Sequence, residues 1–170
     1  MSTIGFIGLG NMGGPMAINL VKAGHKVFGF DLSDAAMAAH EAEGGERAGS
    51  VADLAAAADV IVTMLPAGKH VRQIYEGEGG ILDNAKPGTL MIDSSTIDVD
   101  SARAVSAAAE AKGMKMGNTA GLRRCCRRRG WNADLHGRWI RRGIRSGENL
   151  SRHHGQDHRA CRRRRNRSGG

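Results

Sequence analysis

The chain has 170 residues, enough for one domain with a hydrophobic core of its own. Its net charge of +8 averages two segments of opposite charge. Residues 1–119 carry 9 Lys and Arg against 14 Asp and Glu, whereas residues 120–170 carry 16 Arg, no Lys and 3 acidic residues. All 3 Cys and both Trp also lie in the second segment. We therefore predict a boundary near Thr119.

The composition of the first segment excludes several classes of protein. It contains no Cys, so it has no disulfide framework and suits a reducing compartment. No apolar run approaches the length of a membrane span, and the start of the chain lacks the basic and apolar regions of a secretory signal. These features predict a cytoplasmic protein without a membrane partner.

Strand patterns alternate with helical patterns along residues 1–119. Short apolar or β-branched runs predict strands at Ile4–Gly8, at Lys26–Asp31, within Asp59–Pro66, at Leu90–Asp93 and from Lys115. Helical spacing and capping residues predict helices at Met12–Ala23, from Ser33 to about Glu43, from Ser50, and over about Val99–Lys112 after an Asp98 cap. Because alternating strands and helices form parallel sheets, we predict an α/β fold, a doubly wound parallel sheet with helices on both faces.

A glycine-rich motif follows the first predicted strand and opens the first predicted helix. Its sequence is Gly8-Leu9-Gly10-Asn11-Met12-Gly13. The three glycines permit a tight turn, close approach of the backbone to a pyrophosphate, and close packing of the helix on the strand. Asp31 ends the second strand, where the dinucleotide fingerprint has the acid that binds ribose hydroxyls. The segment is therefore predicted to be a Rossmann-type domain that binds NAD, with Asp31 disfavouring the 2′-phosphate of NADP.

Further motifs resemble one family of dehydrogenases. They are Gly5–Gly13, Pro15-Met16-Ala17, Asn19-Leu20, Thr63–Ala67, Tyr75-Glu76-Gly77, Lys86–Thr89 and Ile92–Asp98. In this order they resemble the β-hydroxyacid dehydrogenases, and within them the 3-hydroxyisobutyrate dehydrogenases of valine catabolism, a part of branched-chain amino acid degradation. The resemblance implies an oxidoreductase that converts 3-hydroxyisobutyrate to methylmalonate semialdehyde as NAD is reduced. It covers residues 1–119.

The resemblance also implies which residues hold the nicotinamide cofactor. They are Gly8, Leu9, Gly10, Asn11, Met12, Gly13, Asp31, Leu65, Pro66 and Thr96. Taken alone, Leu65-Pro66 is equally compatible with an ordinary strand end, and Ser94–Thr96 with a helix-capping turn. Their shared order along the chain favours the cofactor site.

The resemblance stops where the family places its substrate chemistry. The family continues with Asp-Ala-Pro-Val-Ser-Gly-Gly and then a helical domain with a catalytic Lys. Here Asn118-Thr119 is followed by Ala120-Gly121-Leu122, and no Lys occurs after Lys115. No catalytic residue is therefore assigned in this chain, and no metal ligand is expected. The small-molecule substrate and any oligomer belong to the intact parent protein.

A shifted reading frame accounts for residues 120–170. Residues 120–126 can be encoded so that reading one base later gives Pro-Val-Ser-Gly-Gly-Val, the missing family loop. Residues 131–138 and 154–160 can likewise give the family-like peptides Gly-Thr-Leu-Thr-Phe-Met-Val and Met-Gly-Lys-Thr-Ile-Val. All three stretches need the same shift and fall in the family's order. We therefore predict a frameshift after Thr119, a truncated domain, and an Arg-rich tail that is disordered as written.

Two other interpretations of the tail remain open. Its Arg runs, with Trp131 and Trp139, could bind nucleic acid, which would make the chain a truncated nucleotide-binding protein with a basic arm. Its Cys and His residues could bind a metal, although they lack the paired Cys-x-x-Cys spacing of zinc modules. We consider both less compatible with the sequence than the frameshift.

Overall fold

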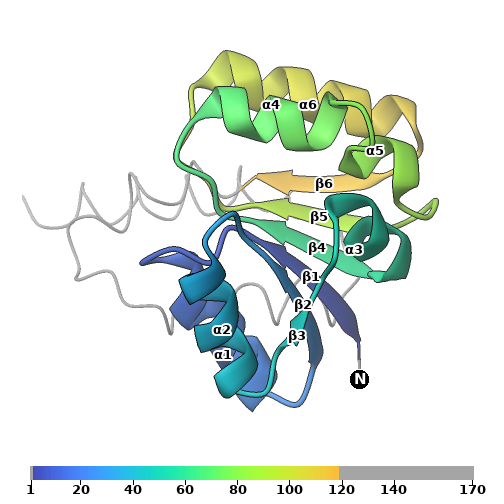
Figure 1. Cartoon of the computed structure of the whole chain (residues 1–170). Helices are drawn as coiled ribbons and strands as arrows, with labels where there is room; N and C mark the ends of the chain where they lie inside the picture. Colours follow the sequence, from blue (N-terminus) through green and yellow to red (C-terminus); the bar gives the residue numbers. More distant parts are fainter. Residues whose placement is uncertain (1, 119–170) are drawn as a thin grey trace, which may run out of the picture.

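A computed structural model describes residues 2–118 of the chain. Six parallel strands form one sheet in the order β3-β2-β1-β4-β5-β6, which is the order of a dinucleotide-binding fold (Figure 1). The strands are β1 (Thr3–Ile7), β2 (Lys26–Phe30), β3 (Glu46–Arg47), β4 (Val60–Thr63), β5 (Leu90–Asp93) and β6 (Lys115–Asn118). The predicted α/β fold class is thus confirmed for the described residues.

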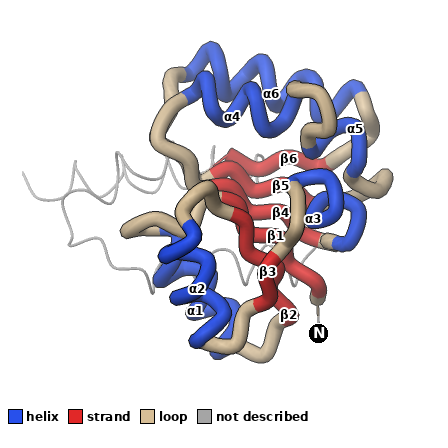
Figure 2. The backbone as a smooth tube through the Cα atoms, in the orientation of Figure 1, coloured by secondary structure: helices blue, strands red, loops and turns tan. Residues whose placement is uncertain are grey.

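Helices cover the sheet in two groups, which Figure 2 shows as blue tubes around the red strands. Near β2 and β1 lie α1 (Gly13–Lys22) and α2 (Asp34–Ala42). The other group contains α3 (Val51–Ala57), α4 (Gly68–Glu76), α5 (Ile81–Asn84) and α6 (Val99–Ala111).

The strands bury side chains on both faces, as their continuous apolar runs predict. Phe6 in β1 belongs to the core that includes α1 and α2, whereas the next residue, Ile7, belongs to the core under α3–α6. In β4 the same alternation places Val60 and Val62 in the first core and Ile61 in the second. One sheet therefore supports two hydrophobic layers, one on each face.

Every strand and helix predicted from the sequence is present, with ends that agree, as in β5, or differ by one to a few residues. The predicted caps also form, because Ser33, Ser50 and Asp98 each accept a hydrogen bond from a backbone N–H in the first turn of the following helix. Three elements were not predicted: β3, α4 and α5. Strand β3 has only two residues, and α5 only four, too few for periodicity to indicate.

The predicted Arg-rich tail, with its frameshift, its disorder and its alternative nucleic-acid and metal interpretations, lies outside the described residues. Within residues 2–118, no helix combines the length and hydrophobicity needed to cross a membrane.

Candidate cofactor site

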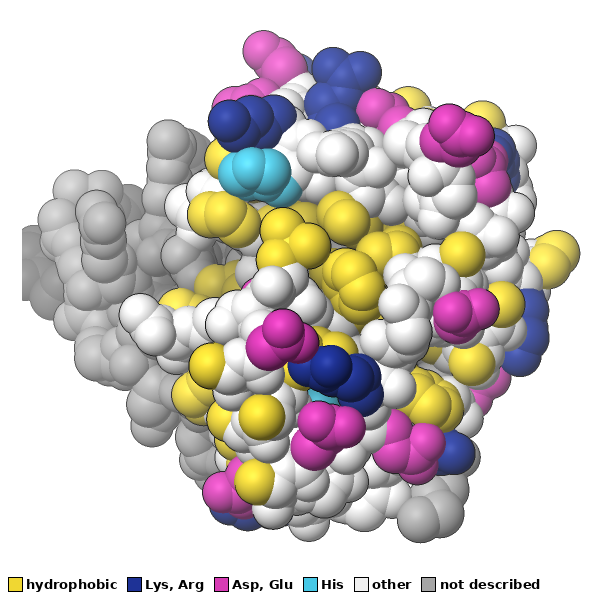
Figure 3. Space-filling model, viewed as in Figure 1, with side chains coloured by type: hydrophobic (Ala, Val, Ile, Leu, Met, Phe, Trp, Pro, Cys, Tyr) yellow, Lys and Arg dark blue, Asp and Glu magenta, His cyan; other side chains and the backbone are white. Residues whose placement is uncertain are grey.

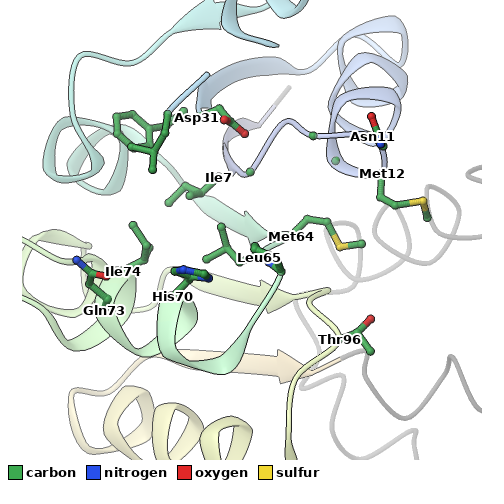
Figure 4. A pocket seen from close by; sticks show the side chains of 16 residues that line it. Ile7, Asn11, Met12, Asp31, Met64, Leu65, His70, Gln73, Ile74 and Thr96 are labelled. Atoms are coloured by element: carbon green, nitrogen blue, oxygen red, sulfur yellow. The ribbon is translucent and has the colours of Figure 1, made fainter. Parts of the chain in front are cut away.

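Four loops converge at the carboxyl ends of neighbouring strands and line one cavity of about 820 Å³ (Figure 4). They follow β1, β2, β4 and β5, which are adjacent in the sheet in the order β2-β1-β4-β5. From β1 the chain adds β2 and β3 on one side of the sheet, and then β4, β5 and β6 on the other side of β1. The neighbouring strands β1 and β4 therefore mark a switch point, where doubly wound folds bind ligands. Topology therefore explains why residues far apart in the sequence share this cavity.

Most of the predicted cofactor residues line the cavity. The nine that do so are Gly8, Gly10, Asn11, Met12, Gly13, Asp31, Leu65, Pro66 and Thr96. Leu9 is the exception. Its side chain is buried in the core beside α1, and its backbone N–H instead contacts a neighbouring loop of the site.

The three motif glycines meet different requirements. Gly8 has φ +93°, a conformation that L side chains rarely adopt, and a Cβ there would also collide with the backbone oxygen of Met64. A Cβ on Gly13 would collide with the carbonyl oxygen of Gly8, so Gly13 lets α1 pack close to β1. A Cβ on Gly10 would meet nothing within 4 Å. Gly10 therefore leaves space for a ligand rather than for the protein itself.

The amino end of α1 presents a positive site to that space. Met12 precedes the helix without a side-chain capping bond, and the first turn contains no acidic residue. The carbonyl of Gly10 accepts a bond of 2.9 Å from the N–H of Gly14, which closes the turn. An uncapped helix start offers free N–H groups and the positive end of the helix dipole, both of which favour phosphate.

Asp31 both lines the cavity and ties two loops together. Its Oδ2 accepts a hydrogen bond of 2.6 Å from the N–H of Leu9, and its Oδ1 accepts one of 2.8 Å from the N–H of Ser33. Each carboxylate oxygen can accept more than one hydrogen bond, so ribose hydroxyls can still donate to it. Asp31 was predicted from the sequence as a cofactor residue; that it also fixes the glycine loop against the end of β2 was not predicted.

The loops after β4 and β5 are joined by a direct hydrogen bond. The N–H of Leu65 donates to Oγ of Ser95 at 2.9 Å, and the N–H of Ser94 donates to the carbonyl of Thr63 at 2.8 Å. Leu65, Pro66 and Thr96 line the cavity from these loops. Ser94 and Ser95 are buried, and the residue that caps the following helix, α6, is Asp98 rather than either serine.

Seven further residues line the cavity that are not among the predicted cofactor residues. They are Ile7, Phe30, Leu32, Met64, His70, Gln73 and Ile74. Three of them lie on α4, the unpredicted helix, and Figure 4 shows His70, Gln73 and Ile74 beside Leu65. The spacing of Val71, Ile74 and Tyr75 could have revealed this helix, because residues three and four apart share a helical face.

The cavity combines apolar side chains with polar ones, among them Asp31, His70, Gln73 and Thr96. Hydrophobic side chains gather in a hollow between the α4–α6 layer and the α1–α2 pair (Figure 3). Leu32, at the edge of the cavity, is 95% exposed. A flat aromatic base binds to apolar surface, a ribose to a carboxylate, and a pyrophosphate to free backbone N–H groups. The residues present therefore fit a dinucleotide.

Comparison with known proteins agrees with this geometry. A family model described as the NAD binding domain of 6-phosphogluconate dehydrogenase matches residues 3–119. The chain belongs to this family. NAD is accordingly the cofactor of this NAD-binding domain, and the match ends at the residue where the composition of the chain changes.

Individual relatives of the NAD-binding domain are dehydrogenases. The chain is 54% identical over 108 residues to a probable mitochondrial 3-hydroxyisobutyrate dehydrogenase of Dictyostelium discoideum, covering 64% of this chain and 34% of that protein. It is 45% identical over 127 residues to an NAD-dependent L-serine dehydrogenase of Pseudomonas aeruginosa, covering 71% of this chain and 43% of that protein.

A solved structure shows the same relationship. Mycobacterium tuberculosis 3-hydroxyisobutyrate dehydrogenase with L-serine is 49% identical, with a TM-score of 0.66, over 69% of this chain and 40% of that one. The chain thus spans about a third to two fifths of the length of the relatives it matches.

Proposed function

We propose that residues 1–119 are the cofactor-binding part of an NAD-dependent dehydrogenase that oxidises 3-hydroxyisobutyrate to methylmalonate semialdehyde. The observation that carries this proposal is the convergence of nine motif residues on one cavity at the switch point of the sheet. The identity to 3-hydroxyisobutyrate dehydrogenases, which reaches 54%, supports the substrate class. The relative that acts on L-serine makes that β-hydroxy acid the second substrate to test.

The residues of this chain would bind and orient the cofactor. The backbone around Gly10 and the start of α1 would hold the pyrophosphate, and Asp31 would accept hydrogen bonds from the adenosine ribose. Leu65, Pro66 and Thr96 would bound the nicotinamide end. When bound, NAD supplies the hydride acceptor, and the protein contributes position and electrostatics.

We propose further that the chain as written binds NAD but does not turn over substrate. It contains neither a Pro-Val-Ser-Gly-Gly loop nor any Lys after Lys115, and both carry the substrate chemistry in the family it resembles. A substrate that is not held near the cofactor loses the advantage of positioning, which can amount to about 7–11 kcal/mol of barrier. A change of reading frame at or just before the codon of Ala120 accounts for both absences.

A comparison of two gene products tests the proposal. The first is the chain of 170 residues, and the second is encoded by the locus with the frame restored after Thr119. We expect both to bind NAD in titration calorimetry. Only the restored protein is expected to produce NADH from 3-hydroxyisobutyrate or L-serine, at an ordinary rate of roughly 1 per second or more.

Three results would contradict parts of this proposal. Turnover by the 170-residue chain would show that its tail had been misinterpreted. Early stop codons in the restored frame would remove the frameshift and make the Arg-rich arm genuine, with nucleic-acid binding as its next test. Failure of both proteins to bind NAD would overturn the proposed use of the cavity.

A further inference from the structure

A cluster of four buried polar side chains lies where β4, β5 and α4 meet. The Asp93 cluster consists of Thr63, Tyr75, Asp93 and Ser95, and each residue has 0% of its surface exposed. Thr63 ends β4 and is paired with Asp93, the last residue of β5, in the register of the sheet. Tyr75 reaches the cluster from α4, and Ser95 belongs to the loop after β5. None of the four lines the cavity.

The hydrogen bonds of the cluster have a defined direction. Oγ1 of Thr63 donates to Oδ1 of Asp93 at 3.0 Å, and the N–H of Ser95 donates to the same oxygen at 3.0 Å. Because Thr63 has only one hydroxyl proton, the Tyr75 hydroxyl must be the donor in its contact of 3.2 Å with Thr63. The chain of donors therefore runs from α4 through β4 to the carboxyl group at the end of β5.

The cluster connects directly to two cavity-lining loops. Ser95, held through its N–H by Asp93, accepts the backbone N–H of Leu65 on its Oγ. Leu65 lines the cavity from the β4–α4 loop, and Thr96, which follows Ser95, lines it from the β5–α6 loop. The spacing between these loops thus depends on hydrogen bonds made outside the cavity.

Simple packing does not require polar groups at these positions. Burial raises the pKa of the Asp93 carboxyl, even though hydrogen bonds from Ser95 and Thr63 oppose the shift. Burial, together with the nearby Asp93, also raises the pKa of the Tyr75 hydroxyl. Burying polar groups costs free energy of desolvation, and replacing them by apolar side chains of similar shape often loses little stability. Hydrogen-bonded networks of buried polar groups instead fix one arrangement of the residues around them.

We infer that Thr63, Tyr75, Asp93 and Ser95 are positioning residues for NAD, because their hydrogen bonds set the distance between the Leu65-Pro66 loop and the Thr96 loop. The inference rests on the proposed use of the cavity for NAD. It assigns a role in affinity to side chains that do not touch the cofactor.

Variants of the full chain test this role in NAD titration calorimetry. Thr63→Val keeps the side-chain shape but removes the hydroxyl, and Ser95→Ala removes the acceptor of the Leu65 N–H. Each is expected to weaken NAD binding by about threefold to tenfold, the equivalent of one net hydrogen bond. Thr63→Ser, which keeps the hydroxyl, is expected to restore the affinity to within about twofold of the unmodified chain.

A matched control separates positioning from general loss of stability. Ser50→Ala removes the cap of α3, a helix with no residue in the cavity, and is expected to lower stability without weakening NAD binding. The inference is overturned if Thr63→Val and Ser95→Ala bind NAD like the unmodified chain. It is also overturned if Ser50→Ala weakens binding as much as they do.

Hydrogen exchange at the Leu65 amide provides a measurement that does not depend on NAD. Ser95→Ala is expected to speed this exchange by about tenfold more than Ser50→Ala does, since only the former removes the bond to that amide. If the unmodified chain fails to bind NAD, the proposed function fails. Unchanged exchange at Leu65 in Ser95→Ala would instead overturn the role of the cluster.

Discussion

Alanine substitutions at Gly10 and Gly13 should separate binding of the cofactor from stability of the fold. Gly10 is not among the glycines with positive φ, and a Cβ there meets no atom within 4 Å. Gly10→Ala should therefore change the free energy of unfolding by no more than about 1 kcal/mol, and in the stabilising direction. The methyl group would occupy the space into which a pyrophosphate must come. Loss of one charge-assisted hydrogen bond, about 1.5–3 kcal/mol, should weaken NAD binding roughly tenfold to a hundredfold.

Gly13→Ala should behave differently because its Cβ would collide with protein backbone, the carbonyl of Gly8. Helix α1 would have to move away from β1, and such overpacking costs about 1–3 kcal/mol. Urea unfolding followed by far-UV circular dichroism measures both variants; Trp fluorescence is unsuitable because both Trp lie after Thr119. The reasoning is refuted if Gly10→Ala loses stability but keeps its NAD affinity, or if Gly13→Ala is as stable as the unmodified chain.

Two further predictions concern carboxylates. The unmodified chain should bind NAD at least about tenfold more tightly than NADP, since a 2′-phosphate would meet the like charge of Asp31. Asp31→Asn and Asp31→Ser should reduce this difference in affinity. Equal binding of both cofactors by the unmodified chain would contradict the proposed role of Asp31. Because burial raises the pKa of Asp93 above its ordinary value of 3.8, ionisation of this group disfavours the folded state. The contribution of Asp93 to the free energy of unfolding is most favourable below pH 3.8 and is lost as the pH rises through the raised pKa of the folded state. Chemical unfolding over a pH series should therefore show that the unmodified chain loses stability relative to Asp93→Asn as the pH rises. A difference in the free energy of unfolding that stays constant with pH would argue against a buried Asp93 that ionises.

The sequence by itself determined the glycine motif, the acid after the second strand and the alternation of strands and helices. These features are local: a turn, a cap or a buried strand depends on residues a few positions apart, so their chemistry is visible in the chain. For this reason the sequence could predict Asp31, Gly8, Gly10 and Gly13 as candidate cofactor residues, all of which line the cavity. The change of composition after Thr119 is likewise a property of the sequence alone.

Only the tertiary structure decided how these local features combine. It showed that Asp31 holds the N–H of Leu9, 22 residues away, and that α4 supplies His70, Gln73 and Ile74 to the cavity wall. It also brought together Thr63 and Asp93, which lie 30 residues apart and meet through the register of two parallel strands. No short-range pattern specifies such contacts, because parallel pairing joins strands across an intervening helix, and the register follows from packing on both faces of the sheet.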